Sequence, residues 1–194
     1  WFREYATAAG EGPLMFVGSL TRETPVDEAA EAIRRHLQFD LEARRRCASW
    51  TEALRLFISQ ADKAGVLVMC SGVVMNNNHR KLDPEEFRGF ALSDDLAPLV
   101  FINGADSKSA QMFTLAHELA HIWLGETALS DTTVASRGQN AIETWCNRVA
   151  AEMLAPLAAV RAAIQQGEPL DQTVTRLARQ FKVSTLVVLL RLRD

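Results

Sequence analysis

The chain has 194 residues, a formal net charge of −3, and 48% hydrophobic and 23% charged residues. This length and composition are typical of an ordinary globular protein with one substantial core. They exclude a protein built around a basic nucleic-acid-binding surface, and the apolar runs are too short to span a bilayer. The three cysteines, Cys47, Cys70 and Cys146, form no CxxC pair, so we expect reduced thiols and a cytoplasmic protein.

The first part of the chain predicts an arm, helices and a strand. Glycine and proline punctuate residues 1–25, which predicts an irregular N-terminal arm or linker. Residues 26–46 and 51–64 carry apolar side chains at helical spacing, and each segment predicts a helix. The short β-branched run 66–70 predicts a strand, and the polar segment 76–86 predicts a loop.

The second part of the chain predicts two more strands and a series of helices. A long helix is expected from Ser107 or Ser109 to about residue 124, where Gly125 is suited to cap its C-terminus. Residues 126–139 are polar and predict irregular structure. The remaining strands are expected at 87–93 and 98–103, and the remaining helices at 140–154, 157–166, 170–181 and 184–193. A small mixed or antiparallel sheet among helices makes the predicted fold α+β.

The long predicted helix contains the segment HELAH, from His117 to His121. Residues four apart share a helical face, so the two imidazoles can converge on one cation, and imidazole nitrogen is a good zinc ligand. Glu118 lies beside them and could accept a proton from water whose pKa zinc has lowered to about 7. This helix is apolar almost all round, which predicts burial and makes unpaired histidines costly. A buried histidine pair without a metal is the alternative interpretation.

A catalytic zinc site needs a third protein ligand and an open position for water. The helix predicted at 140–154 offers Glu143, and Asn147 shares its face and could hydrogen-bond a ligand histidine. Glu152 is the rival third ligand, and Asp131 in the preceding segment is a weaker one. A solvated glutamate near a helix start is the interpretation of Glu143 that needs no metal.

Three stretches resemble the ImmA/IrrE family of metallopeptidases: LDPEEFRGFAL (82–92), VFINGADSKSAQMFTLAHELAHIWLG (100–125) and ETWCNRVAAEMLAP (143–156). The first stretch resembles the segment that feeds an edge strand beside the cleft. The resemblance implies a zincin-like core of the minimal thermolysin (gluzincin) type, with its small sheet packed against the ligand-bearing helices. It also implies one Zn²⁺ per chain held by His117, His121 and Glu143, with catalysis by Glu118.

The resemblance further implies a bacterial endopeptidase that cuts a helix-turn-helix transcriptional repressor, or an antitoxin-like regulator, in a stress response. Residues 26–160 would form the metallopeptidase domain, and residues 161–194 a C-terminal helical extension packed on its core. Some family members carry an N-terminal DNA-binding domain. Residues 1–25 resemble the linker after such a domain, so DNA would be contacted only indirectly. No membrane partner is expected.

Three residues are weaker candidates for substrate binding. Arg88 and Gly89 fall in the strand predicted at 87–93, and an edge strand can bind a peptide by main-chain pairing. His79, in the polar segment, could donate to an oxyanion, although a solvated loop histidine is the simpler interpretation. A non-catalytic module that sequesters a repressor, and a metalloenzyme acting on a small amide, are the alternative functions. Manganese or cobalt could occupy such a site in vitro.

Overall fold

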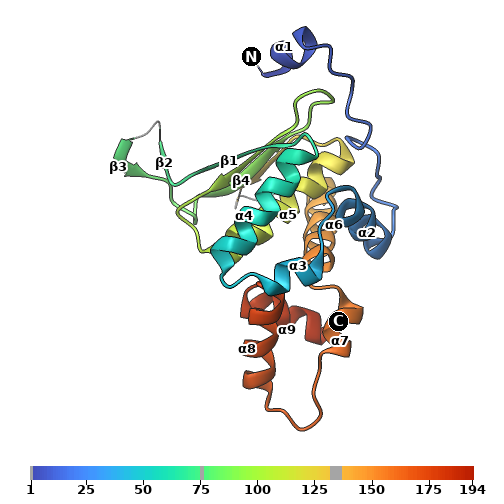
Figure 1. The fold of residues 1–194 in the computed structure, drawn as a ribbon, viewed down its shortest axis with the longest axis vertical. Helices are drawn as coiled ribbons and strands as arrows, with labels where there is room; N and C mark the ends of the chain where they lie inside the picture. Colours follow the sequence, from blue (N-terminus) through green and yellow to red (C-terminus); the bar gives the residue numbers. More distant parts are fainter. Residues whose placement is uncertain (1, 75–76, 132–136) are drawn as a thin grey trace.

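The computed structural model describes residues 2–74, 77–131 and 137–194, with the backbone alone for Asn78, 128–131 and 137–140. Helices and a small sheet give a mixed α+β fold (Figure 1). The helices are α1 (Phe2–Ala8), α2 (Val26–His36), α3 (Leu41–Arg46), α4 (Trp50–Lys63), α5 (Lys108–Leu124), α6 (Arg137–Leu154), α7 (Leu157–Ala162), α8 (Leu170–Phe181) and α9 (Thr185–Arg193). The strands are β1 (Leu67–Ser71), β2 (Val73–Val74), β3 (Asn77–Lys81), β4 (Phe87–Leu92), β5 (Leu99–Asn103) and β6 (Ala128–Asp131).

The main sheet has the strand order β1-β5-β4-β6. Strand β1 runs parallel to β5, whereas β4 is antiparallel to both β5 and β6. Strand β4 is therefore not the edge strand that the sequence suggested, because β6 pairs with its outer side. The irregular structure expected over 126–139 contains this short strand. The loop expected over 76–86 likewise contains β3, which forms a hairpin with β2.

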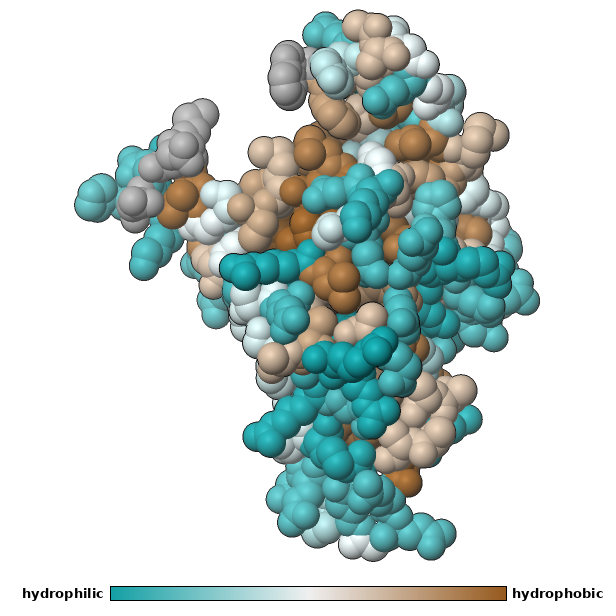
Figure 2. Space-filling view, in the orientation of Figure 1, coloured by the Kyte–Doolittle hydropathy of each residue, from teal (hydrophilic) through white to brown (hydrophobic). Residues whose placement is uncertain are grey.

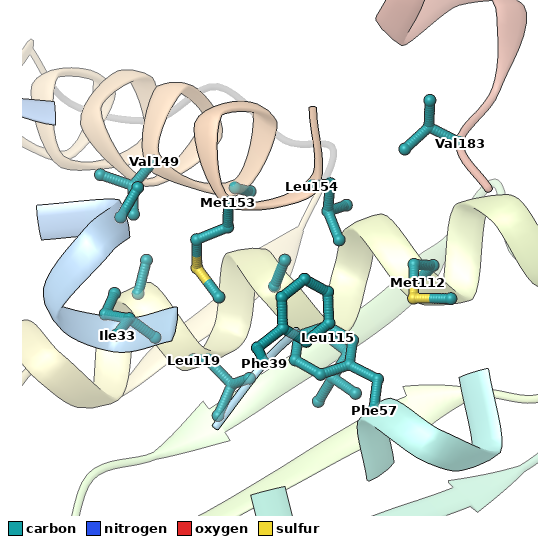
Figure 3. Close-up of a cluster of buried hydrophobic side chains, with 14 of the residues drawn as sticks. Ile33, Phe39, Phe57, Met112, Leu115, Leu119, Val149, Met153, Leu154 and Val183 are labelled. Carbon is teal, nitrogen blue, oxygen red and sulfur yellow. The ribbon is translucent and has the colours of Figure 1, made fainter. Parts of the chain in front are cut away.

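Helix α5 lies between the sheet and α6. It packs on β4 and β5 with one face and on α6 with another, while α2 packs on α6 in turn. Twelve of its 17 residues are buried, which confirms the predicted buried helix. Figure 3 shows Leu115 and Leu119 of α5 surrounded by side chains from α2, α4 and α6. The predicted caps of α5 are also present. The Ser107 hydroxyl accepts from the Ala110 N–H, and Gly125 adopts a left-handed φ of 73°.

The helix expected over 26–46 is interrupted. Helix α2 ends at His36, and Gln38 adopts a positive φ of 52°. The Asp40 side chain then accepts a hydrogen bond from the Glu42 N–H and starts α3. The break turns Leu37 and Phe39 into the core, where both are buried. Aspartate is a strong helix-start residue, so the local signal for this break was present in the sequence.

The three C-terminal helices continue the same core. Leu177, Val183, Val187 and Val188 belong to the hydrophobic cluster that contains the buried face of α5. Hydrophilic side chains dominate the lower end of the molecule, where Figure 1 places α8 (Figure 2). Within the part of the chain that the structure describes, no helix is both long and apolar enough to cross a bilayer.

Candidate metal centre

Two histidines on one turn of α5 face each other inside the molecule. The Nε2 atoms of His117 and His121 lie 3.1 Å apart, and both side chains are buried. Their positions, four residues apart on a helix, place both rings on one face of α5. The structure therefore gives the convergent pair of imidazoles that the HELAH segment predicts.

Glu143 comes to this pair from α6. Its Oε2 atom lies 3.1 Å from the Nε2 atom of His117, and its Oε1 atom lies 3.3 Å from the Nε2 atom of His121. Hydrogen bonds with His117 first, and then with His121, lower the pKa of the Glu143 carboxyl to about 2. The carboxyl is consequently ionised at neutral pH, which is the form that binds a metal.

The donor set fits a zinc ion. In a tetrahedral site with ligand bonds of about 2.0–2.1 Å, two ligand atoms lie about 3.3–3.4 Å apart. The two histidine Nε2 atoms lie 3.1 Å apart, and each lies 3.1 or 3.3 Å from a different oxygen of the Glu143 carboxylate, close to that spacing. With one ligand atom taken from each residue, the three atoms lie within 4.8 Å of one another. Among the described residues, these three form the group of His, Cys, Asp and Glu side chains that could hold a metal ion. Three protein ligands leave a fourth position, as catalytic zinc sites require.

Glu118 lies next to the first histidine and is fully buried. Strand β4 approaches it closely at Gly89. A Cβ atom added to Gly89 would lie 3.5 Å from Glu118 Oε1, 2.5 Å from Thr114 Cγ2 and 2.7 Å from the carbonyl oxygen of Phe101. Only a glycine fits there, so Gly89 allows β4 to pack against α5 beside the Glu118 carboxylate. The prediction that Gly89 lies in a strand is confirmed, but its close contact with α5 was not predicted.

Two of the three weaker substrate candidates, Arg88 and His79, are exposed. Arg88 is exposed, at the register shift between β4 and β6. His79 is exposed in β3, and its backbone N–H donates to Asn77 Oδ1. The β2–β3 hairpin projects from the body of the molecule, away from α5 (Figure 1). The structure thus does not bring His79 to the histidines.

Asn147 does not support the histidines as the sequence suggested. Its side chain is exposed. The Nδ1 atoms of His117 and His121 are both buried and have no hydrogen-bond partner among the described residues. The hydrogen bond proposed from Asn147 to a ligand histidine is therefore absent from the described part of the chain.

The two rival third ligands have different positions. The Glu152 carboxylate pairs with Arg191 and accepts a hydrogen bond from the Leu157 N–H at 3.3 Å. The side chain of Asp131 lies outside the described residues. Of the acidic side chains that the structure describes, it is Glu143 that joins the two histidines.

Comparison of the sequence with known proteins identifies a family. The IrrE N-terminal-like domain family matches residues 61–193. The chain is similar to the radiation response metalloprotease IrrE of Deinococcus radiodurans, with 35% identity over 101 residues, covering 50% of this chain and 31% of the relative. It is also similar to the radiation response metalloprotease IrrE of Deinococcus deserti, with 32% identity over 101 residues, covering 50% of this chain and 36% of the relative. The chain thus matches about a third of the length of these curated relatives. Because the family match covers more than half of the chain, the chain belongs to the IrrE N-terminal-like domain family.

Proposed function

We propose that this chain is a zinc-dependent endopeptidase with a zincin-like core. His117, His121 and Glu143 would hold one Zn²⁺, and Glu118 would act as the general base. The observation that carries this proposal is the convergence of the His117 and His121 Nε2 atoms and the Glu143 carboxylate, with nearest separations of 3.1 to 3.3 Å. The buried Glu118 follows His117 on the same helix. The relatives' description as metalloproteases supports it.

Bound zinc would supply a Lewis acid that polarises a carbonyl group and lowers the pKa of water. Glu118 would take a proton from the attacking water and pass it to the departing amine as the C–N bond breaks. Its burial favours this task, because electrostatic interactions are stronger where water is excluded. A pure metal-binding scaffold would not need a carboxylate at this position.

The sheet offers a place for an extended peptide. Strand β6 is the last strand beyond β4, and Gly89 of β4 is paired with Ser130 of β6. A peptide could add to the outer edge of β6, which is the end strand of the sheet among the described residues, by main-chain hydrogen bonds. We therefore assign substrate pairing to β6 in place of β4, and a protein substrate in place of a small amide.

The proposed substrate is a helix-turn-helix repressor or an antitoxin-like regulator in the bacterial cytoplasm. The family resemblance and the relatives' description as radiation response proteins support a task in a stress response. DNA would then be involved only indirectly, through the repressor or through a DNA-binding domain joined to the arm.

The test compares zinc-loaded wild type with Glu118→Gln on purified helix-turn-helix repressors from the source organism. Mass spectrometry would identify the fragments. We expect Glu118→Gln to cleave about 10²- to 10⁴-fold more slowly, since it lacks the general base, while its zinc content stays that of wild type. If wild type and Glu118→Gln relieve repression equally and neither produces fragments of the repressor, sequestration would replace proteolysis as the function.

A further inference from the structure

Part of the N-terminal arm, residues 14–24, lies across the C-terminal end of α5. We call this segment the strap. The Gly18 N–H donates to the carbonyl oxygen of Ile122 at 3.1 Å, and the Leu20 N–H donates to that of Trp123 at 3.0 Å. These carbonyl groups belong to the last turn of α5, one and two residues beyond His121. The strap therefore pairs with the end of the helix that carries two proposed ligands.

Side-chain packing strengthens this contact. The Phe16 ring stacks on Trp123 with 4.4 Å between ring centroids, and it also contacts His36 of α2 at 4.5 Å. The backbones meet at two glycines, since a Cβ atom on Gly125 would lie 3.0 Å from Gly18 Cα. A larger residue at Gly125 would push the strap away from α5.

The same strap is bonded to α6. The Trp145 indole Nε1–H donates to the carbonyl oxygen of Thr24 at 3.1 Å. Trp145 is buried and lies two residues beyond Glu143, just as Trp123 lies two residues beyond His121. One continuous segment thus binds both ligand-bearing helices close to their ligands.

The start of the strap is fixed to the sheet. The Leu14 N–H donates to the carbonyl oxygen of Asp95, in the connection between β4 and β5, at 2.6 Å. Arg3 of α1 forms ion pairs with Asp94 and Asp95 in that connection. In Figure 1 the chain runs from α1 down one side of the molecule to α2. Hydrogen bonds fix the strap at its first residue, Leu14, and at its last, Thr24.

We propose that the strap positions α5 and α6 relative to each other, and that Phe16 and Trp145 are positioning residues of the metal centre. This inference rests on the proposed zinc site. A metal site needs its ligands held within about 0.5 Å of their working geometry. Loss of a strap contact would let the ends of α5 and α6 move, and the spacing between His121 and Glu143 would vary. Zinc would then leave faster. Removing a group that supports ligands from outside the ligand set typically costs 10- to 100-fold in metal affinity.

The test measures the rate of zinc release from the full chain to a chromophoric chelator. Phe16→Ala removes the stacked ring, and Trp145→Phe removes the donor to Thr24 while keeping an aromatic side chain. Phe181→Ala is the matched control, because Phe181 on α8 is 6% exposed and Phe16 is 7% exposed. Met15→Ala changes a strap side chain that is 85% exposed.

We expect Phe16→Ala and Trp145→Phe to release zinc roughly 10-fold faster than wild type, while Phe181→Ala and Met15→Ala release it at the wild-type rate. The visible spectrum of the Co²⁺-loaded protein, which reports ligand geometry, should change in the first two variants alone. Should Phe16→Ala not fold, Trp145→Phe carries the test.

Equal release rates in Trp145→Phe and wild type, or in Phe16→Ala and Phe181→Ala, would overturn the positioning role and leave the zinc site intact. A wild-type chain that binds no zinc would overturn the zinc site and the positioning role together.

Discussion

The Glu152 carboxylate on α6 accepts a hydrogen bond from the guanidinium of Arg191 on α9, and this ion pair joins the two helices. The Arg191 Nε–H also donates to the carbonyl oxygen of Ala155 at 3.0 Å, beyond the end of α6. Both side chains are largely buried. Glu152 is therefore part of the contact between α6 and α9, and its carboxylate is unavailable to the two histidines.

We expect Glu152→Ala to destabilise the protein without loss of zinc. Removal of Glu152 leaves the buried Arg191 guanidinium with the half-exposed Asp194 carboxylate, 3.2 Å away, as its ion-pair partner. Loss of one partner of a buried pair costs up to about 3 kcal/mol of unfolding free energy. The exposed pair Glu31–Arg35 provides the control, since Glu31→Ala should cost less than about 1 kcal/mol. Urea denaturation measures both values. Equal costs for the two variants would contradict the assignment of Glu152 to a buried pair.

Gly89→Ala tests the approach of β4 to α5. The new methyl group would lie 2.5 Å from Thr114 Cγ2 and 2.7 Å from the carbonyl oxygen of Phe101, so β4 and α5 must separate. Such overpacking typically costs about 1–3 kcal/mol. Proteolysis should also slow, because Glu118 moves with α5. Thermal or urea unfolding measures the cost.

The control for this prediction is Gly12→Ala. A Cβ atom at Gly12 meets no atom within 4 Å, and Gly12 has no positive φ. We expect a change within about 0.5 kcal/mol there. Thr114→Ser should partly restore Gly89→Ala, because it removes the Cγ2 atom that the methyl group meets. A Gly89→Ala protein as stable as Gly12→Ala would show that β4 and α5 are not in contact at this point.

Glu168 gives a pH prediction that is independent of the metal centre. Its hydrogen bonds with Arg176 first, and then with Thr173, lower the pKa of the carboxyl from 4.5 to about 2. A carboxyl with a lowered pKa in the folded state stabilises the fold above its unfolded value of 4.5. That contribution is lost as the pH falls towards 2.

Wild type should accordingly be more stable than Glu168→Gln at pH 7, and the difference should shrink between pH 4.5 and 3. Urea titrations at several pH values measure it, and added salt should reduce it because the pair is near the surface. A difference that is the same at pH 3 and pH 7 would mean that the ionised carboxyl does not contribute.

The parts of the fold that were predictable from sequence depend on local signals. Helix α5 has a serine at its start and a glycine at its end, and both caps are confirmed. The convergence of His117 and His121 follows from helix geometry alone, because a spacing of four residues fixes their common face. A single short segment was therefore enough to predict this pair.

The parts that were missed depend on contacts between distant segments. Glu143 was preferred to Glu152 from helical phase, and the structure brings Glu143 to the histidines. What the sequence did not reveal is the ion pair that holds Glu152 against α9. Strand β6 has no alternating pattern of its own and is defined by its pairing with β4. The strap was predicted only as irregular, since its hydrogen bonds go to Ile122 and Trp123, far along the chain. An isolated glycine in a strand does signal a close approach, so the packing at Gly89 could have been predicted.

The most direct test of the proposed centre is the zinc content of the purified chain, measured by plasma mass spectrometry after dialysis, beside Glu143→Ala and Glu152→Ala. We expect one zinc per chain for wild type and for Glu152→Ala, and little or none for Glu143→Ala. A chain without zinc, or zinc that is lost from Glu152→Ala and retained by Glu143→Ala, would contradict the proposed centre.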